Sequence, residues 1–298
     1  MEHTEVVVGA VVGKVTCMGL GLMGSALARC FVRHGHNVTV WNRQPEKRKA
    51  FEGRAKIAST PAEACAASDL IIVCVSTYDA SESFLHTPEV AEAAKGKTIV
   101  QFTSGSSLDA RKGAEWARGH GVHYLDACVL GYPSDVDADN GWFFFSGPRA
   151  LFDKHASVLK TMSGSVTFVG EPVGCAAALD SALLETYYMA TIGLLHAASI
   201  CRSEGMELDH FFNAVADFVP LIGTTAEVAR KQIASGNYKG AEATLDVHVA
   251  AQEHIVTVSR ANGIDLSVPE FVIDRCKRAI AAGYGPHEIS AVYETFRK

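Results

Sequence analysis

The chain has 298 residues, of which 48% are hydrophobic and 20% charged, and its formal net charge is −6. This length suits two domains with sizeable cores, and the acidic balance argues against nucleic acid as a partner. The apolar run at residues 6–13 is too short to cross a bilayer and follows acidic rather than basic residues. We therefore expect a cytoplasmic protein with no membrane or nucleic-acid partner.

Short apolar runs alternate with amphipathic stretches through the first 170 residues. The runs predict strands at 14–18, 37–41, 69–75, 98–102, 122–127, 141–146 and 165–169. The stretches predict helices at 22–34, 45–52, 61–67, 89–94, 107–119 and 148–161. This alternation indicates βαβ units and a doubly wound, mostly parallel sheet of the Rossmann type.

The pattern changes after residue 170. A long helix is predicted at 173–204, with further helices beginning after Leu208, Pro220, Ala241 and Pro269. We therefore expect an α/β domain at 1–170 and an all-α domain at 171–298, joined by a long interdomain helix. So long an apolar helix needs a partner surface on several sides, which favours a homodimer with interlocking helical domains.

Three glycines form the strongest local motif. Gly19, Gly21 and Gly24 give G-x-G-x-x-G between the first predicted strand and the first predicted helix. This context predicts a dinucleotide pyrophosphate bound by residues 19–24, which are Gly19, Leu20, Gly21, Leu22, Met23 and Gly24. A glycine-rich turn without a ligand is the alternative.

The end of the second predicted strand indicates which dinucleotide binds. NAD enzymes usually place an acid there, but this chain has Asn42 and Arg43, with Lys47 and Arg48 one turn later. A guanidinium binds a 2′-phosphate, so we predict NADPH. Lys47 and Arg48 are equally consistent with a solvated helix start.

Polar residues at two further strand ends extend this cofactor prediction. Ser76, Thr103 and Ser104 follow the strands predicted at 69–75 and 98–102, at the carboxyl edge of the sheet. We expect them to contact the cofactor, with Ser104 near the nicotinamide. Serine and threonine at such positions are also ordinary helix N-caps.

Cysteines and clustered acids give no metal motif. The eight cysteines form no C-x-x-C pair and mostly lie in apolar runs, which favours buried free thiols. Asp135, Asp137 and Asp139 lack the glycine and glutamate spacing of an EF-hand. We expect no bound metal, and a solvated loop at 132–140 on the rim of the cleft.

Asp180 is the least expected residue of the helical part. It lies within "GCAAALDSALLETYYMA", residues 174–190, which is predicted to begin a buried helix. A buried carboxylate is costly unless something compensates its charge.

The glycine motif, "NR" at 42–43, "SGSSLDARKGAEWARGHGVHYLDA" and the helix after "VGEPVGCA" resemble the β-hydroxyacid dehydrogenase superfamily from Lys14 to about Arg278. Within it the chain looks most like the NADPH-dependent imine reductases and reductive aminases. The resemblance implies a Rossmann domain, a helical domain and a domain-swapped dimer. The active site would lie between one subunit's Rossmann domain and its partner's helical domain.

The departures from the hydroxyacid enzymes carry the functional prediction. Asp180 occupies the position of their catalytic lysine, Leu183 and Leu184 those of two asparagines, and Leu130 that of a serine that anchors the substrate carboxylate. Replacing a cation with a carboxylate opposes an alkoxide and favours an iminium. The resemblance therefore implies that Asp180 stabilises or protonates an imine, in a pocket suited to apolar amines.

Three more positions are implied by the resemblance. Tyr188, which shares a helix face with Asp180 and Leu184, matches a tyrosine that orients substrate, although a core aromatic is an equal interpretation. Phe218 matches a pocket aromatic. His248 matches a polar residue that the partner subunit contributes. With Leu130 and Leu184, the last two complete the predicted substrate pocket.

Three hypotheses remain open at this stage. The first is an NADPH-dependent reductase of cyclic imines, with or without reductive amination of carbonyls. The second is a hydroxyacid dehydrogenase with an altered site. The third is a non-catalytic NADPH-binding protein, which an intact glycine loop without the lysine would permit.

Overall fold

The computed structural model describes residues 12–138, 141–240 and 242–296. Predictions that fall on residues 6–11 and on Asp139 lie outside these ranges. The chain divides into two compact units, 1–185 and 186–298, and each is described by itself.

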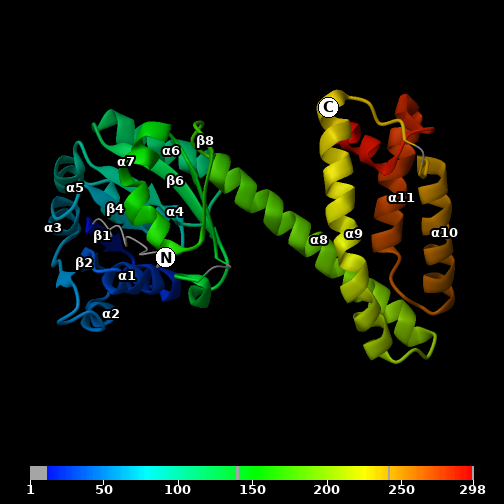
Figure 1. The fold of residues 1–298 in the computed structure, drawn as a ribbon, viewed down its shortest axis with the longest axis horizontal. Coiled ribbons are helices and arrows are strands. Elements are labelled where there is room, and N and C mark those ends of the chain that lie inside the picture. Colours follow the sequence, from blue (N-terminus) through cyan, green and yellow to red (C-terminus); the bar gives the residue numbers. More distant parts are fainter. Residues whose placement is uncertain (1–11, 139–140, 241, 297–298) are drawn as a thin grey trace, which may run out of the picture. The chain divides into compact units, whose positions relative to one another are not determined.

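The first unit is built on one sheet (Figure 1). Its strands are β1 (Lys14–Met18), β2 (Asn37–Trp41), β3 (Lys56–Ile57), β4 (Leu70–Val73), β5 (Thr98–Gln101), β6 (His123–Leu130), β7 (Trp142–Ser146) and β8 (Ser165–Gly170). Their spatial order is β3-β2-β1-β4-β5-β6-β7-β8, and every neighbouring pair is parallel except β6–β7. The seven predicted strands are present.

Helices cover both faces of this sheet. They are α1 (Leu22–Arg33), α2 (Pro45–Lys49), α3 (Pro61–Ala66), α4 (Tyr78–Leu85), α5 (Pro88–Ala94), α6 (Ser107–Gly119) and α7 (Arg149–Leu159), with short 3-10 turns at Pro133–Asp135 and Lys160–Met162. In β4, Leu70 and Ile72 pack toward α1 and α7, while Ile71 and Val73 pack toward α3, α5 and α6. A strand buried on both faces reads as a continuous apolar run, and the predicted doubly wound fold is confirmed.

Two elements of this unit were not predicted. Strand β3 has only two residues, too few for a periodic signal. Helix α4 has the sequence YDASESFL and buries only Tyr78, Ser81 and Leu85, so its apolar pattern is weak. Strand β6 also runs three residues further than predicted, because its end pairs with β7, Leu130 opposite Trp142.

The second unit is helical. It takes in the end of α8 (Cys175–Ser203), then α9 (Leu208–Ser235), α10 (Leu245–Ala261), α11 (Ser267–Ala279), a π-helical turn at Ile280–Tyr284 and a 3-10 helix at Ile289–Thr295. Its core joins α10, α11 and the C-terminal turns through Tyr238, Leu245, Val249, Cys276, Ala279 and Ala291. The helical character and the long helix are as predicted.

The predicted helix boundary at Pro220 is wrong. Helix α9 is 28 residues long, and Pro220 lies inside it. A proline inside a helix removes one backbone hydrogen bond and costs about 3 kcal/mol, which a helix stabilised along its remaining turns tolerates. The Thr225 hydroxyl also donates to the Leu221 carbonyl at 3.0 Å in the following turn.

The predicted burial of α8 holds only at its start. Gly174, Ala176 and Ala177 are buried, whereas residues 181–190 are all exposed in the single chain. The side chains of Leu183, Tyr187 and Tyr188 are 38%, 60% and 59% exposed. The apolar side chains of these turns are therefore largely exposed to solvent among the described residues.

Two further properties come from the described residues. The eight cysteines are free thiols, five of them buried and three, Cys74, Cys175 and Cys201, partly exposed. None of the described helices combines the length and apolar character needed to cross a bilayer.

Candidate active site

The glycine loop follows β1, and its three glycines have different reasons to be glycine. Gly19 has φ of +97°, and a Cβ there would lie 2.1 Å from the Cys74 carbonyl oxygen. A Cβ on Gly24 would lie 2.1 Å from the Gly19 oxygen. A Cβ on Gly21 would meet nothing within 4 Å. Two glycines therefore permit close backbone packing, and the third opens the loop to a ligand.

Helix α1 begins beside this loop without any side-chain cap. Its first N–H groups are thus free to meet an anion, which the helix dipole favours. A cavity of about 610 Å³ lies there, large enough for a cofactor. A hollow of similar volume beside His86, Trp116 and His120 contains none of the predicted site residues.

Nine predicted cofactor residues line the cavity next to α1: Gly19, Gly21, Leu22, Met23, Gly24, Asn42, Arg43, Lys47 and Ser76. Sequence reasoning missed Trp41, Gln44, Cys74, Val75, Ala80, Ser83 and Phe84. The last three belong to the unpredicted helix α4. A βα unit requires an element after β4, and that requirement was the available signal.

Asn42 and the nearby cations have separate tasks. The buried Leu20 does not line the cavity, but its N–H donates to Asn42 Oδ1 at 2.9 Å, so Asn42 holds the glycine loop. Arg48 points elsewhere and donates to the Ala58 carbonyl at 3.0 Å. Arg43 and Lys47 are exposed at the cavity, and no acidic side chain of the described ranges pairs with either. Two cations therefore line the cavity without an acidic partner among the described residues.

The serine and threonine positions divide between two sites. Ser76 lines the large cavity, whereas Thr103 and Ser104 line a small one at the start of α8. Thr103 Oγ1 also accepts a hydrogen bond from the Val75 N–H at 3.3 Å. The N-cap role belongs instead to neighbouring residues, Thr77 for α4 and Ser106 for α6.

Asp180 lines that small cavity, which has a volume of about 20 Å³. Its wall comes from the loop that follows β5, from β6 and from Ala177 of α8. Burial, and then the nearby charge of Asp126, raise the pKa of Asp180. A half-buried acid with a raised pKa is a typical proton carrier.

Asp126 is the charged residue of this site that the sequence analysis did not select. It is 1% exposed and accepts hydrogen bonds from the Ala177 N–H and the Ser146 hydroxyl, both at 3.1 Å. The signal was present, because an aspartate inside the apolar strand "HYLDACVL" needs a compensating partner.

The predicted substrate residues are dispersed over the chain. Leu130 ends β6 and Leu184 is 38% exposed on α8, and neither lines the Asp180 cavity. Tyr188, Phe218 and His248 belong to the second unit, on α8, α9 and α10. Phe218 is 61% exposed.

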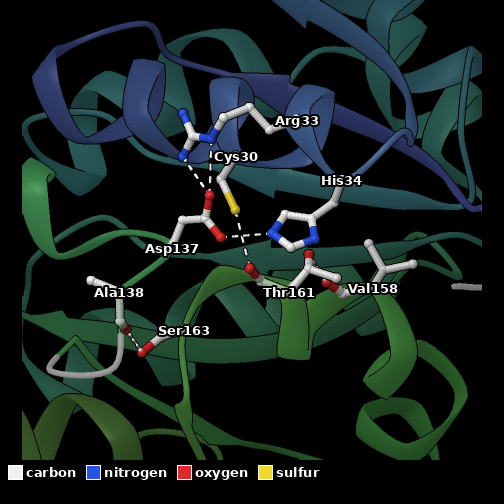
Figure 2. Close-up of polar contacts among 8 residues, drawn as sticks. All are labelled: Cys30, Arg33, His34, Asp137, Ala138, Val158, Thr161 and Ser163. Atoms are coloured by element: carbon white, nitrogen blue, oxygen red, sulfur yellow. Dashed lines mark hydrogen bonds and ion pairs between the residues drawn. The ribbon is translucent and has the colours of Figure 1, made fainter. Parts of the chain in front are cut away.

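The loop at 132–138 is tied to the end of α1 (Figure 2). Asp137 binds Arg33 at 2.8 Å and His34 at 2.6 Å. The ligand atoms of Cys30, His34 and Asp137 lie within 4.8 Å of one another. Since the guanidinium of Arg33 already neutralises Asp137, we interpret this cluster as a polar latch that fixes the loop. Asp137 is thus held by ion pairs to the end of α1 rather than only solvated.

Known proteins resemble both parts of this chain, the part with the glycine loop and the helical part. Residues 14–170 match the model of the NAD binding domain of 6-phosphogluconate dehydrogenase. Residues 172–298 match the C-terminal domain of NADPH-dependent reductive aminase-like proteins. A solved structure of an imine reductase from Myxococcus stipitatus with NADP+ superposes with a TM-score of 0.86 and 32% identity, over 95% of this chain and 100% of that one. The chain belongs to the imine reductase and reductive aminase family.

Other relatives agree with this assignment. The NADPH-dependent reductive aminase of Aspergillus oryzae is 29% identical over 94% of this chain and 95% of its own length. A reductive aminase from Aspergillus terreus, solved with NADPH4, cyclohexanone and allyl amine, has a TM-score of 0.83 and 30% identity, over 96% of this chain and 100% of that one. The predicted family and its oxidoreductase class are confirmed.

A relative of another kind is also similar. The cytokine-like nuclear factor N-PAC of Anopheles gambiae is 26% identical over 94% of this chain, which spans 50% of that protein. This chain therefore spans only half the length of that relative.

Proposed function

We propose that the protein reduces C=N bonds with NADPH, acting on cyclic imines and on imines formed from a carbonyl and an amine. The observation that carries this proposal is Asp180, a half-buried carboxyl group in a small cavity at the start of α8. Hydroxyacid enzymes of the superfamily place a lysine there. A carboxyl group instead protonates an imine and stabilises the iminium that results.

The residues around the large cavity fit NADPH. Gly21 leaves room for a pyrophosphate, α1 offers uncapped N–H groups, and Arg43 and Lys47 offer charge to a 2′-phosphate. NADPH supplies the hydride. The chain's own contribution is to hold the dinucleotide at the carboxyl edge of the sheet, where Ser76, Thr103 and Ser104 also lie.

The substrate pocket in this proposal takes residues from two subunits. Leu130 and Leu184 give an apolar wall, Tyr188 orients the substrate, and Phe218 and His248 come from the partner's helical domain. Support for a homodimer comes from α9, which buries none of its residues in the single chain. Its side chains Phe218, Leu221 and Ile222 are more than 50% exposed. We place the boundary between the two domains at 170/171.

One assay separates the three hypotheses. The protein is incubated with NADPH and a pyrroline, and separately with NADP+ and a panel of β-hydroxy acids, while absorbance at the nicotinamide band is followed. Imine turnover supports the proposal, and hydroxy acid oxidation supports an altered dehydrogenase. Tight NADPH binding without turnover of either class would indicate a non-catalytic protein.

A further inference from the structure

A row of buried polar side chains crosses the sheet beneath the first turn of α8. Gln101 of β5, Asp126 of β6 and Ser146 of β7 are register partners on adjacent strands, and none is more than 2% exposed. Register partners project from the same face of a sheet. Polar side chains are costly at such a position unless they have a structural or chemical task.

Two members of this row hold the start of α8. Ser146 Oγ accepts the Ala176 N–H at 3.0 Å, and Asp126 Oδ2 accepts the Ala177 N–H at 3.1 Å. These N–H groups have no partner within the helix, and a negative charge at a helix N-terminus is favourable. Residues distant in the sequence therefore fix the orientation of this turn.

Asp180 follows Ala177 by three residues, so both lie on the same side of α8. Asp126 and Asp180 line the same small cavity. Asp126 has hydrogen-bond donors, whereas no hydrogen bond to the Asp180 carboxyl group is found in the described part of the chain. When two carboxyl groups share a site, the group that accepts more hydrogen bonds keeps the charge and the other takes the proton.

The tyrosine and cysteine side chains around Asp126 and Asp180 do not offset the negative charge of Asp126. Burial raises the pKa of the Tyr78 and Tyr124 hydroxyls and of the Cys128 thiol, so all three are neutral. The one nearby cation, within the described residues that pack on this turn, is Arg111 of α6, which packs against Gly174. Burial also raises the pKa of Asp126, against the effect of its hydrogen bonds.

We propose that Asp126 is a positioning residue for the reaction at Asp180. It fixes the first turn of α8 and places a negative charge behind Asp180, so that Asp180 holds the proton that the imine nitrogen receives. This inference rests on the proposed function. In the step, the O–H bond of Asp180 breaks and an N–H bond forms on the imine, which leaves a carboxylate beside the iminium. NADPH would supply the hydride to the iminium carbon, and Asp180 would then regain a proton from water.

The test is the titration of Asp180, followed by NMR of the full-length protein labelled with ¹³C at aspartate carboxyl carbons. Loss of one signal in Asp180→Asn assigns it. Asp126→Asn keeps an oxygen for the Ala177 N–H but removes the charge. We expect the midpoint of Asp180 to fall by about one pH unit or more, and the alkaline limb of the kcat profile to move with it.

Ser146→Ala is the matched control, because it removes a bond to α8 and one hydrogen bond to Asp126 but leaves the Asp126 carboxyl group and its bond from the Ala177 N–H in place. It should move the Asp180 midpoint by no more than a few tenths of a pH unit. An unchanged midpoint in Asp126→Asn, or an equal shift in Ser146→Ala, overturns the proposal. If Asp126→Asn does not fold, the wild-type protein gives the test. An Asp180 midpoint at or below the ordinary aspartate value of about 3.9 would then overturn the proposal.

The titration requires no turnover, so the two proposals fail separately. A raised, Asp126-dependent midpoint without imine reduction rejects the proposed function alone. Imine reduction with an unshifted midpoint rejects the role of Asp126 alone.

Discussion

Two helices of the first unit begin at the carboxyl edge of the same sheet, and they begin differently. Helix α1 starts without a side-chain cap, beside a glycine with nothing within 4 Å of its Cβ position. Helix α8 starts with two N–H groups bound to the buried Ser146 and Asp126. An open helix start is suited to a ligand's phosphate, whereas a closed one holds a side chain in place. In this chain the closed start orients Asp180.

The largest expected effect tests what the closed helix start orients. Asp180→Asn keeps the shape of the side chain but removes its acid, and we expect kcat for imine reduction to fall by about 10²–10⁴-fold. NADPH affinity, measured by fluorescence titration, should stay near the wild-type value. Ser181→Ala, one residue along α8, is the control and should retain activity. An unchanged rate and pH profile in Asp180→Asn would show that Asp180 is not the proton carrier.

The open start of α1 is tested by its glycines. Gly24→Ala forces a Cβ against the Gly19 oxygen, and we expect the free energy of unfolding to fall by about 1–3 kcal/mol. Gly21→Ala has free space, so it should unfold like the wild type in urea and yet bind NADPH more weakly. If the two variants lose stability equally, the assignment of Gly21 to the ligand is wrong.

The preference for NADPH over NADH should depend on Arg43 and not on Arg48. Arg43→Ala should raise the KM for NADPH by about 10–100-fold, because a charge-assisted hydrogen bond is lost, and change the KM for NADH little. Arg48→Ala is the matched control, since Arg48 donates to the Ala58 carbonyl. It should lower stability without changing the preference. Equal effects of Arg43→Ala on both cofactors would exclude the phosphate contact.

The smallest effect concerns a tertiary contact remote from both helix starts. Burial opposes ionisation of Asp137, but His34 and Arg33 outweigh it and hold the pKa of this carboxyl group below its usual value. The stability it contributes is therefore present above the unfolded pKa and is lost as pH falls through the folded pKa. We expect Asp137→Asn to lower the free energy of unfolding by about 0.5–1 kcal/mol at pH 7, and by less below pH 4.

Urea unfolding at the two pH values measures this contribution of Asp137. Asp153→Asn, which removes a more exposed pair with Arg149, should have a smaller effect at pH 7. A larger loss at low pH than at pH 7 would contradict the latch.

Most of the fold followed from local pattern. Continuous apolar runs gave seven strands, because strands buried on both faces leave a strong signal in the sequence. Two-residue β3 and the polar helix α4 left none. The break predicted at Pro220 was wrong, because the intrinsic preference of proline did not outweigh the other turns of α9.

The cofactor site was largely predictable for the same reason. The G-x-G-x-x-G spacing places Gly19, Gly21 and Gly24 by backbone geometry alone, and Asn42 and Arg43 follow the next strand directly. The task of Asn42 in holding Leu20 was not predictable, since it depends on the distance between two strand ends.

The sequence by itself determined the doubly wound sheet and the glycine loop, because these depend on residue order and periodicity, and its resemblance to the hydroxyacid enzymes implied that Asp180 replaces a lysine. Only the tertiary structure decided what surrounds Asp180. Asp126 and Ser146 lie 51 and 30 residues from the α8 N–H groups that they bind, and sheet register alone brings them together. The ionisation of a half-buried acid depends on such neighbours, since burial and adjacent charge act over a few ångströms of space rather than along the chain.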